Sequence, residues 1–158
     1  MGFNEKVHAF IAAKFYVYLT EAFGERGERA FIHGTQYYAE QRGRRMAQRA
    51  IRDGKELTYA NYLEYGEWVN TQEIIDEGCA NKSTIESWAP DYRIHITMCP
   101  WYTQFKEMGL PDAGHVYCAH LDNSICRGFN PLPTKIIFLN FLLSFFLLYP
   151  ATTSAFFR

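Results

Sequence analysis

Apolar residues in the first half of the chain recur every three or four positions, which is the spacing of amphipathic helices. In the first of these segments the apolar set begins with Val7, Ile11 and Phe15, and Gly24 follows as a stop signal. Asp53-Gly54 and Gly78 end the next two segments in the same way. The pattern therefore predicts three helices, over residues 4–23, about 28–52 and 59 to about 77.

The sequence pattern changes from helical to extended after the third predicted helix. Residues 83–88 and 92–98 form two extended runs, separated by the turn-forming sequence Ala89-Pro90-Asp91. The second run alternates, with Ile94 and Ile96 on one face and Arg93, His95 and Cys99 on the other. This pattern is typical of an antiparallel pair with one face packed on helices, and the polar face then meets either solvent or a pocket.

Two further helices are predicted, over residues 101–108 and from Pro111 to about residue 126. Proline suits the first turn of a helix, and the glycines after each segment mark its end. The order of elements predicts the α+β class, with N-terminal helices packed on a small antiparallel β-sheet, followed by a C-terminal helical segment.

An atypical apolar tail follows this predicted domain, so we divide the chain into a domain over residues 1–131 and a tail over residues 132–158. Residues 136–149 carry no charge. As a helix they would be about 21 Å long, shorter than the roughly 30 Å hydrocarbon core of a bilayer. Three interpretations stay open: a segment not native to the domain, a membrane-associated tail, or a core helix.

Composition excludes some classes of function. The chain has 158 residues, 48% of them hydrophobic, enough for one domain with a real core. Its net charge of −1 provides no basic field for a nucleic-acid backbone, so we expect no nucleic-acid partner. The charged N-terminal sequence has no secretory signal, which predicts a cytoplasmic protein whose four cysteines are reduced thiols.

Arginines recur along the second predicted helix. Arg42, Arg45, Arg49 and Arg52 are three, four and three residues apart, which places them on one helical face. This face can be a solvated surface. Alternatively, one or two of these guanidinium groups bind a substrate carboxylate.

Reactive side chains concentrate near the last predicted helix. Cys118, Asp122 and Cys126 are four residues apart and share one helical face, which His115 joins. A thiol beside an imidazole and a carboxylate can serve as a nucleophile with its acid-base partner, or can ligate a metal. Buried cysteines that only pack are the alternative, because free cysteine is among the most buried residue types.

A family resemblance is carried by the motifs in this region. The motif positions are Cys99-Pro100-Trp101, Gly109, Tyr117-Cys118, Asp122 and Gly128-Phe129-Asn130-Pro131. This set resembles the central motif of the L-2-amino-thiazoline-4-carboxylic acid hydrolase-like family, and the resemblance covers roughly residues 1–131. In that family a further strand follows the Asn-Pro motif, and we expect it to be missing here.

The resemblance implies a hydrolase that opens a small cyclic isothiourea by water, giving a carbamoyl-cysteine. Such chemistry requires attack on the ring carbon, delivery of a proton, and binding of the substrate carboxylate. Cys118 as nucleophile or Asp122 as activator of water is expected to supply the attack, and His95 or His115 the proton. The catalytic candidates are Cys118, Asp122, His95 and Cys99, and the substrate-binding candidates are Arg93, Arg45, His115 and Tyr117.

The expected partner is a small-molecule substrate. No cofactor is required by the sequence, although a divalent metal is possible because Cys, His and Asp also ligate metals. The alternative function is a non-catalytic homologue that binds a small ligand or a partner in a biosynthetic pathway.

Overall fold

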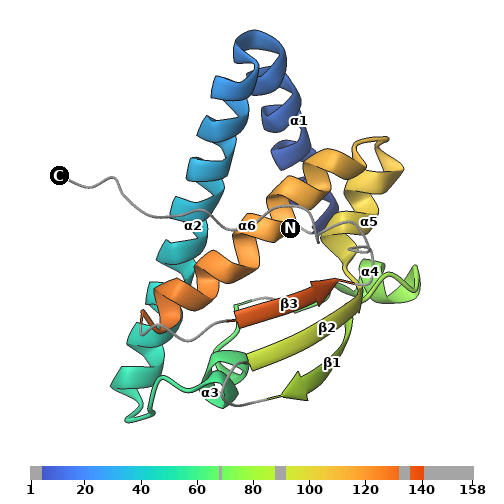
Figure 1. Cartoon of the computed structure of the whole chain (residues 1–158). Coiled ribbons are helices and arrows are strands. Elements are labelled where there is room, and N and C mark those ends of the chain that lie inside the picture. Colours follow the sequence, from blue (N-terminus) through green and yellow to red (C-terminus); the bar gives the residue numbers. More distant parts are fainter. Residues whose placement is uncertain (1–4, 68, 88–91, 132–135, 141–158) are drawn as a thin grey trace, which may run out of the picture.

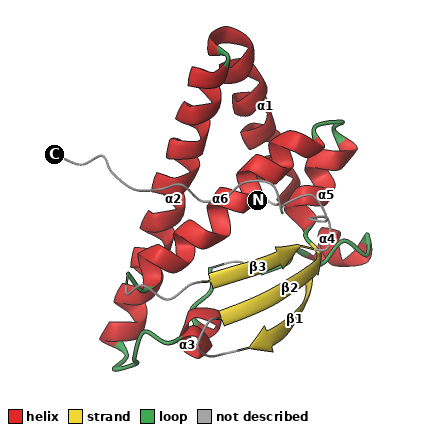
Figure 2. Cartoon of the chain, viewed as in Figure 1, coloured by secondary structure: helices red, strands yellow, loops and turns green. Residues whose placement is uncertain are grey.

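The computed structural model of the chain describes residues 5–67, 69–87, 92–131 and 136–140. Long helices lie along one side of a small three-stranded sheet, and two short helices lie near the ends of that sheet (Figures 1 and 2). This arrangement confirms the predicted α+β class. The elements are α1 (Glu5–Phe23), α2 (Glu25–Arg52), α3 (Tyr59–Glu64), α4 (Gln72–Asp76), β1 (Lys82–Ser87), β2 (Tyr92–Met98), α5 (Pro100–Glu107), α6 (Pro111–Phe129) and β3 (Ile136–Asn140).

Helix α1 packs through small residues rather than through its bulky apolar stripe. Ala9 and Ala13 are fully buried, whereas Phe15 and Tyr18 are 61% and 69% exposed. The alanine face lets α1 lie close against α2 and α5. The helical period was therefore predicted correctly, but the apolar stripe of α1 does not face the core.

Helices α2 and α6 pack closely where they cross. A Cβ atom on Gly43 would lie 2.0 Å from the carbonyl oxygen of Ile125, and one on Gly128 would lie 2.2 Å from that of Glu40. These separations are far below van der Waals contact, so neither position has room for a side chain. Backbone therefore packs directly on backbone where the two helices cross.

The single helix predicted over residues 59–77 is wrong. The structure has two short helices, α3 and α4, joined by a loop that carries Gly66 and Glu67. Glycine disfavours helix, and tertiary contacts hold the start of α4 in place. The carboxylate of Glu5 accepts hydrogen bonds from the backbone N–H of Thr71 at 3.0 Å and from its hydroxyl at 2.8 Å.

The sheet contains the predicted hairpin and one strand that we did not expect. Strands β1 and β2 pair antiparallel, with Ile85 opposite Ile94. Strand β3 pairs with β2 in parallel, with Phe138 opposite Ile94. The expectation that the last strand is missing is therefore wrong, and the sheet includes residues that we had assigned to the tail. Parallel strands are often continuous apolar runs, so the segment that forms β3 does not show the alternation of apolar and polar residues that marks an antiparallel strand.

The remaining tail predictions concern residues 132–135 and 141–158, which lie outside the described residues. In the part of the chain that the structure describes, no helix combines the length and the apolar character needed to cross a membrane.

The core lies where α1, α2, α5 and α6 meet. Phe105 and Phe129 are almost completely buried, and Tyr117 packs against the rings of Phe31, Trp101 and Phe105 at centroid distances of 6.2, 5.9 and 5.6 Å. Such ring pairs stabilise the core beyond the area that they bury. The aromatic core holds α5 and α6 at fixed positions beside the sheet.

Gly43→Ala should lower the free energy of unfolding by at least about 2 kcal/mol, because its methyl group would enter the backbone of α6. Gly34→Ala on the same helix is the matched control, since a Cβ there meets nothing within 4 Å. That control should gain up to about 1 kcal/mol from better helix propensity. Urea denaturation checks both variants, and equal effects would contradict the close crossing.

Candidate functional site

A cavity of about 350 Å³, which we call the central cavity, lies between the sheet and the helix layer. Strand β2 contributes Ile94 and Ile96 to its wall, and helices α2 and α6 contribute Arg42 and Asp122. A volume of this size suits a small ligand, and apolar walls with a few charged groups are typical of ligand pockets.

A second cavity of about 290 Å³, the side cavity, lies next to the first and includes His115. Ile96, Cys99, Cys118 and Asp122 line both cavities. The two thiols and the carboxylate therefore form one group in the wall between two spaces, and this group is the candidate catalytic centre.

Cys99 has the features of an activated thiol. It is the residue before Pro100 at the start of α5, so the first N–H groups of that helix point toward it. A hydrogen bond from Cys118 lowers the pKa of Cys99, burial opposes this, and backbone N–H groups of Tyr102 and Trp101 lower it further. The net pKa of Cys99 lies below its ordinary value, so its thiolate forms more readily than that of an ordinary cysteine.

Cys118 has the opposite character. Its hydrogen bond to Cys99, together with burial, raises the pKa of Cys118 well above its ordinary value. In this pair Cys118 thus stays protonated, and its S–H group faces the sulfur of Cys99 as a donor. The opposite pKa shifts favour Cys99 over Cys118 as the nucleophile, whereas we had expected either Cys118 to attack or Asp122 to activate water.

Asp122 is suited to proton transfer. Burial raises the pKa of its carboxyl group to about 6, and the positive charge of Arg42 lowers it only in part. A carboxyl group with such a pKa can both donate and accept a proton near neutral pH. Asp122 therefore fits an acid-base role beside the Cys99 thiolate.

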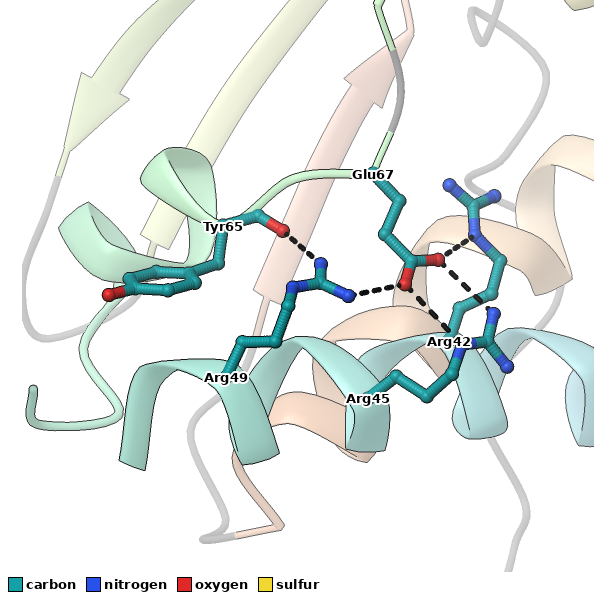
Figure 3. A network of polar contacts seen from close by, with 5 residues as sticks. All are labelled: Arg42, Arg45, Arg49, Tyr65 and Glu67. Atoms are coloured by element: carbon teal, nitrogen blue, oxygen red, sulfur yellow. Dashed lines mark hydrogen bonds and ion pairs between the residues drawn. The ribbon is translucent and has the colours of Figure 1, made fainter. Parts of the chain in front are cut away.

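Three arginines of α2 converge on the carboxylate of Glu67, which comes from the loop between α3 and α4 (Figure 3). Arg49 donates from Nη1 at 2.9 Å, Arg45 donates from Nη2 at 3.2 Å, and Arg42 donates from Nε at 3.4 Å. Arg49 also donates to the carbonyl oxygen of Tyr65 at 2.9 Å. We call Arg42, Arg45 and Arg49 the arginine cluster.

The other predicted site residues lie in different places. His95 is part of neither the central nor the side cavity, because its strand neighbours Ile94 and Ile96 face them. Tyr117 belongs to the aromatic core and lines neither cavity. The backbone of Arg93 is in β2, but its side chain lies outside what the structure describes.

Two residues of the candidate site were absent from our prediction. Glu67 was placed within a helix, and Tyr62 was assigned to packing. Tyr62 lines the central cavity and lowers the pKa of Cys126 in part, against the larger effect of burial. The excess of arginine on one face of α2 was a signal that a carboxylate must lie opposite, and it could have led to Glu67.

All four cysteines are free thiols. In the described residues, no group of three or more His, Cys, Asp or Glu side chains gathers in a way that could hold a metal ion. The candidate centre consists of the thiols of Cys99 and Cys118 and the carboxyl group of Asp122.

Comparison with known families agrees with the resemblance carried by the motifs. Residues 4–139 match the family model of L-2-amino-thiazoline-4-carboxylic acid hydrolase, so the chain belongs to this family. The match extends into β3, which supports including that strand in the domain. No curated protein and no solved structure matches the chain.

Cys99 should react with iodoacetamide at neutral pH faster than Cys118 and Cys126, because only its pKa is lowered among these three thiols. Peptide mass spectrometry over a pH series measures the three rates. Cys118→Ala should slow the alkylation of Cys99 near neutral pH, since the hydrogen bond to its thiolate is lost. Faster labelling of Cys118 than of Cys99 would contradict the assignment.

Asp122→Asn should remove a pH-dependent cost to stability. The pKa of Asp122 is about 6 in the fold against an ordinary value of 3.8, so the folded protein binds this proton more tightly than the unfolded chain does. The wild-type protein therefore keeps its stability relative to the variant at low pH and loses it as the pH rises from about 4 through about 6. At about 1.4 kcal/mol for each pKa unit, the variant should gain on the order of 3 kcal/mol at pH 8 compared with pH 4. Urea titrations at both pH values test this, and a constant difference would contradict it.

Proposed function

We propose that the chain is a hydrolase that opens the ring of a small cyclic isothiourea acid such as L-2-amino-thiazoline-4-carboxylate. The observation that carries the proposal is Cys99, a thiol of lowered pKa at the start of α5, beside Asp122 in a small cavity. Membership in the family supports the substrate class.

The first step forms a bond between the Cys99 sulfur and the ring carbon that carries one sulfur and two nitrogens. The tetrahedral intermediate then breaks its bond to the ring sulfur, and the electron pair goes to that sulfur. Asp122 in its acid form protonates the leaving thiolate. The substrate is now an open-chain isothiourea attached to Cys99, and no fragment has been released.

The second step consumes one water molecule. Asp122, now a carboxylate, takes a proton from the water as its oxygen adds to the same carbon. The bond to Cys99 breaks, the thiolate returns, and the product rearranges to N-carbamoyl-cysteine. Both residues are regenerated, and no electrons are exchanged with another reagent.

Two other groups support this scheme. Cys118 donates to the sulfur of Cys99 and can stabilise the thiolate each time it forms. His115 lines the side cavity and is an alternative proton donor to the ring nitrogen. We place the reaction in the cytoplasm, where thiols stay reduced.

Cys99→Ser should reduce formation of N-carbamoyl-cysteine from L-2-amino-thiazoline-4-carboxylate by at least about 100-fold, measured by mass spectrometry of the product. Asp122→Asn should cost about 100-fold or more, the usual contribution of acid-base catalysis. Single-turnover samples quenched in acid should carry the full mass of the substrate on the peptide of Cys99.

Cys118→Ser is the discriminating variant, because serine can still donate a hydrogen bond to Cys99. It should keep the adduct on Cys99 and lose activity by about tenfold or less. An adduct on Cys118 in the wild-type protein would refute Cys99 as the nucleophile. Ligand binding without turnover by the folded wild-type protein would instead favour a non-catalytic binding homologue.

A further inference from the structure

The arginine cluster has more positive charge than its internal partner can neutralise. Three guanidinium groups surround the one carboxylate of Glu67, and they offer many more N–H donors than two oxygens can accept. Asp122 also senses the charge of Arg42, but even with both carboxylates ionised the three guanidinium groups leave one positive charge in excess. The arginine cluster is therefore suited to bind a second anion beside Glu67, or another anion in place of Glu67.

The cluster is also partly removed from water. The side chains of Arg42, Glu67 and Arg49 are 12%, 20% and 35% exposed, whereas that of Arg45 is 51% exposed. Charge pairs in such surroundings are screened less by salt than pairs on an open surface. Burial alone would raise the pKa of Glu67, but hydrogen bonds from Arg49 and Arg45 and the nearby charges outweigh it, so that pKa lies below its ordinary value.

The cluster borders the candidate catalytic centre. Arg42 and Glu67 line the central cavity, whose wall also holds Cys99 and Asp122. They line a third cavity of about 330 Å³ as well, which lies on the side of His8 and Thr71. An anion held by Arg42 would thus be in the same space as the reactive thiol.

Glu67 reaches the arginines from a loop rather than from a helix or strand. The carboxylate is held by hydrogen bonds from all three arginines, as in Figure 3, and Arg49 also fixes the loop at the carbonyl of Tyr65. Proteins commonly bind the carboxylate of a ligand through hydrogen bonds from guanidinium groups. Glu67 therefore occupies the position that such a ligand would take.

We propose that Arg42, Arg45 and Arg49 form the binding site for the carboxylate of a small-acid ligand, and that Glu67 fills this site until the ligand displaces it. The identity of the ligand rests on the proposed function, whereas the exchange of one carboxylate for another does not. The exchange keeps the cluster neutralised in both states, and the competition with Glu67 lowers the affinity for the ligand.

The test measures binding to Cys99→Ser protein, which cannot form the adduct. The probe is L-thiazolidine-4-carboxylate, and its uncharged carboxamide is the ligand control. Calorimetry should give at least about tenfold tighter binding of the carboxylate when Glu67→Gln is added, because the internal competitor is gone. Arg42→Gln should weaken it at least about tenfold. The carboxamide should bind weakly to all variants.

Two matched controls separate the cluster from its surroundings. Glu64→Gln removes an exposed carboxylate on α3 that pairs with Lys55 at 3.9 Å, and Arg44→Gln removes an exposed arginine of α2 that pairs with Glu40 at 3.8 Å. Neither change should alter the affinity more than about twofold. Unchanged or weaker binding in folded Glu67→Gln protein would overturn the proposal, because Glu67 would then only support the loop.

A second measurement covers the case in which Glu67→Gln does not fold. In protein that retains Glu67, the NMR signal of its side-chain carboxylate carbon should shift as L-thiazolidine-4-carboxylate saturates the site, and no shift would overturn the exchange. If the carboxylate binds tightly but the wild-type protein shows no turnover of L-2-amino-thiazoline-4-carboxylate, the proposed function alone is refuted. If the wild-type protein turns over normally but the carboxamide binds as tightly as the carboxylate, this inference alone is refuted.

Discussion

The direct contact of backbone with backbone at Gly43 and Gly128 is the constraint on which the site depends. Because α2 and α6 cross without side chains between them, side chains close to the crossing on both helices converge on the same space. Met46 and Arg42 of α2 and Asp122 and Ile125 of α6 line the central cavity for this reason. A wider crossing would separate the arginines from the thiols, and it would move the charge of Arg42 away from Asp122.

In the candidate catalytic centre the two thiols differ in pKa, so Cys99 loses its proton before Cys118 does. Cys118 and the N–H groups at the start of α5 lower the pKa of Cys99, whereas Cys99 and burial raise the pKa of Cys118, which remains a thiol. Asp122 disfavours a second negative charge nearby and keeps its own proton up to a pH of about 6. The centre can thus hold a thiolate and a proton donor together, which is the combination that ring opening with a sulfur leaving group needs.

Local signals explain what could be predicted from the sequence. Glycine and proline mark the ends of α2, α5 and α6, and the four-residue spacing of Cys118 and Asp122 placed both on one face of α6. Long-range contacts explain what could not. Glu67 is 18 to 25 residues from its arginine partners, and β3 becomes a strand only because β2 lies beside it. The Cys99-Pro100 pair did contain the helix start that activates the thiol, although alternation along β2 suggested that Cys99 faced away with His95.

The parallel pairing of β2 with β3 bears on the order in which the protein folds. A tight turn cannot join parallel neighbours, so the chain between them carries both α5 and α6. Cys99, Cys118 and Asp122 all lie on that connection. Closing so long a loop costs entropy before its contacts form, which makes such pairings late events in folding. We therefore expect β3 to join the sheet late in folding, well after the α1–α2 hairpin has formed.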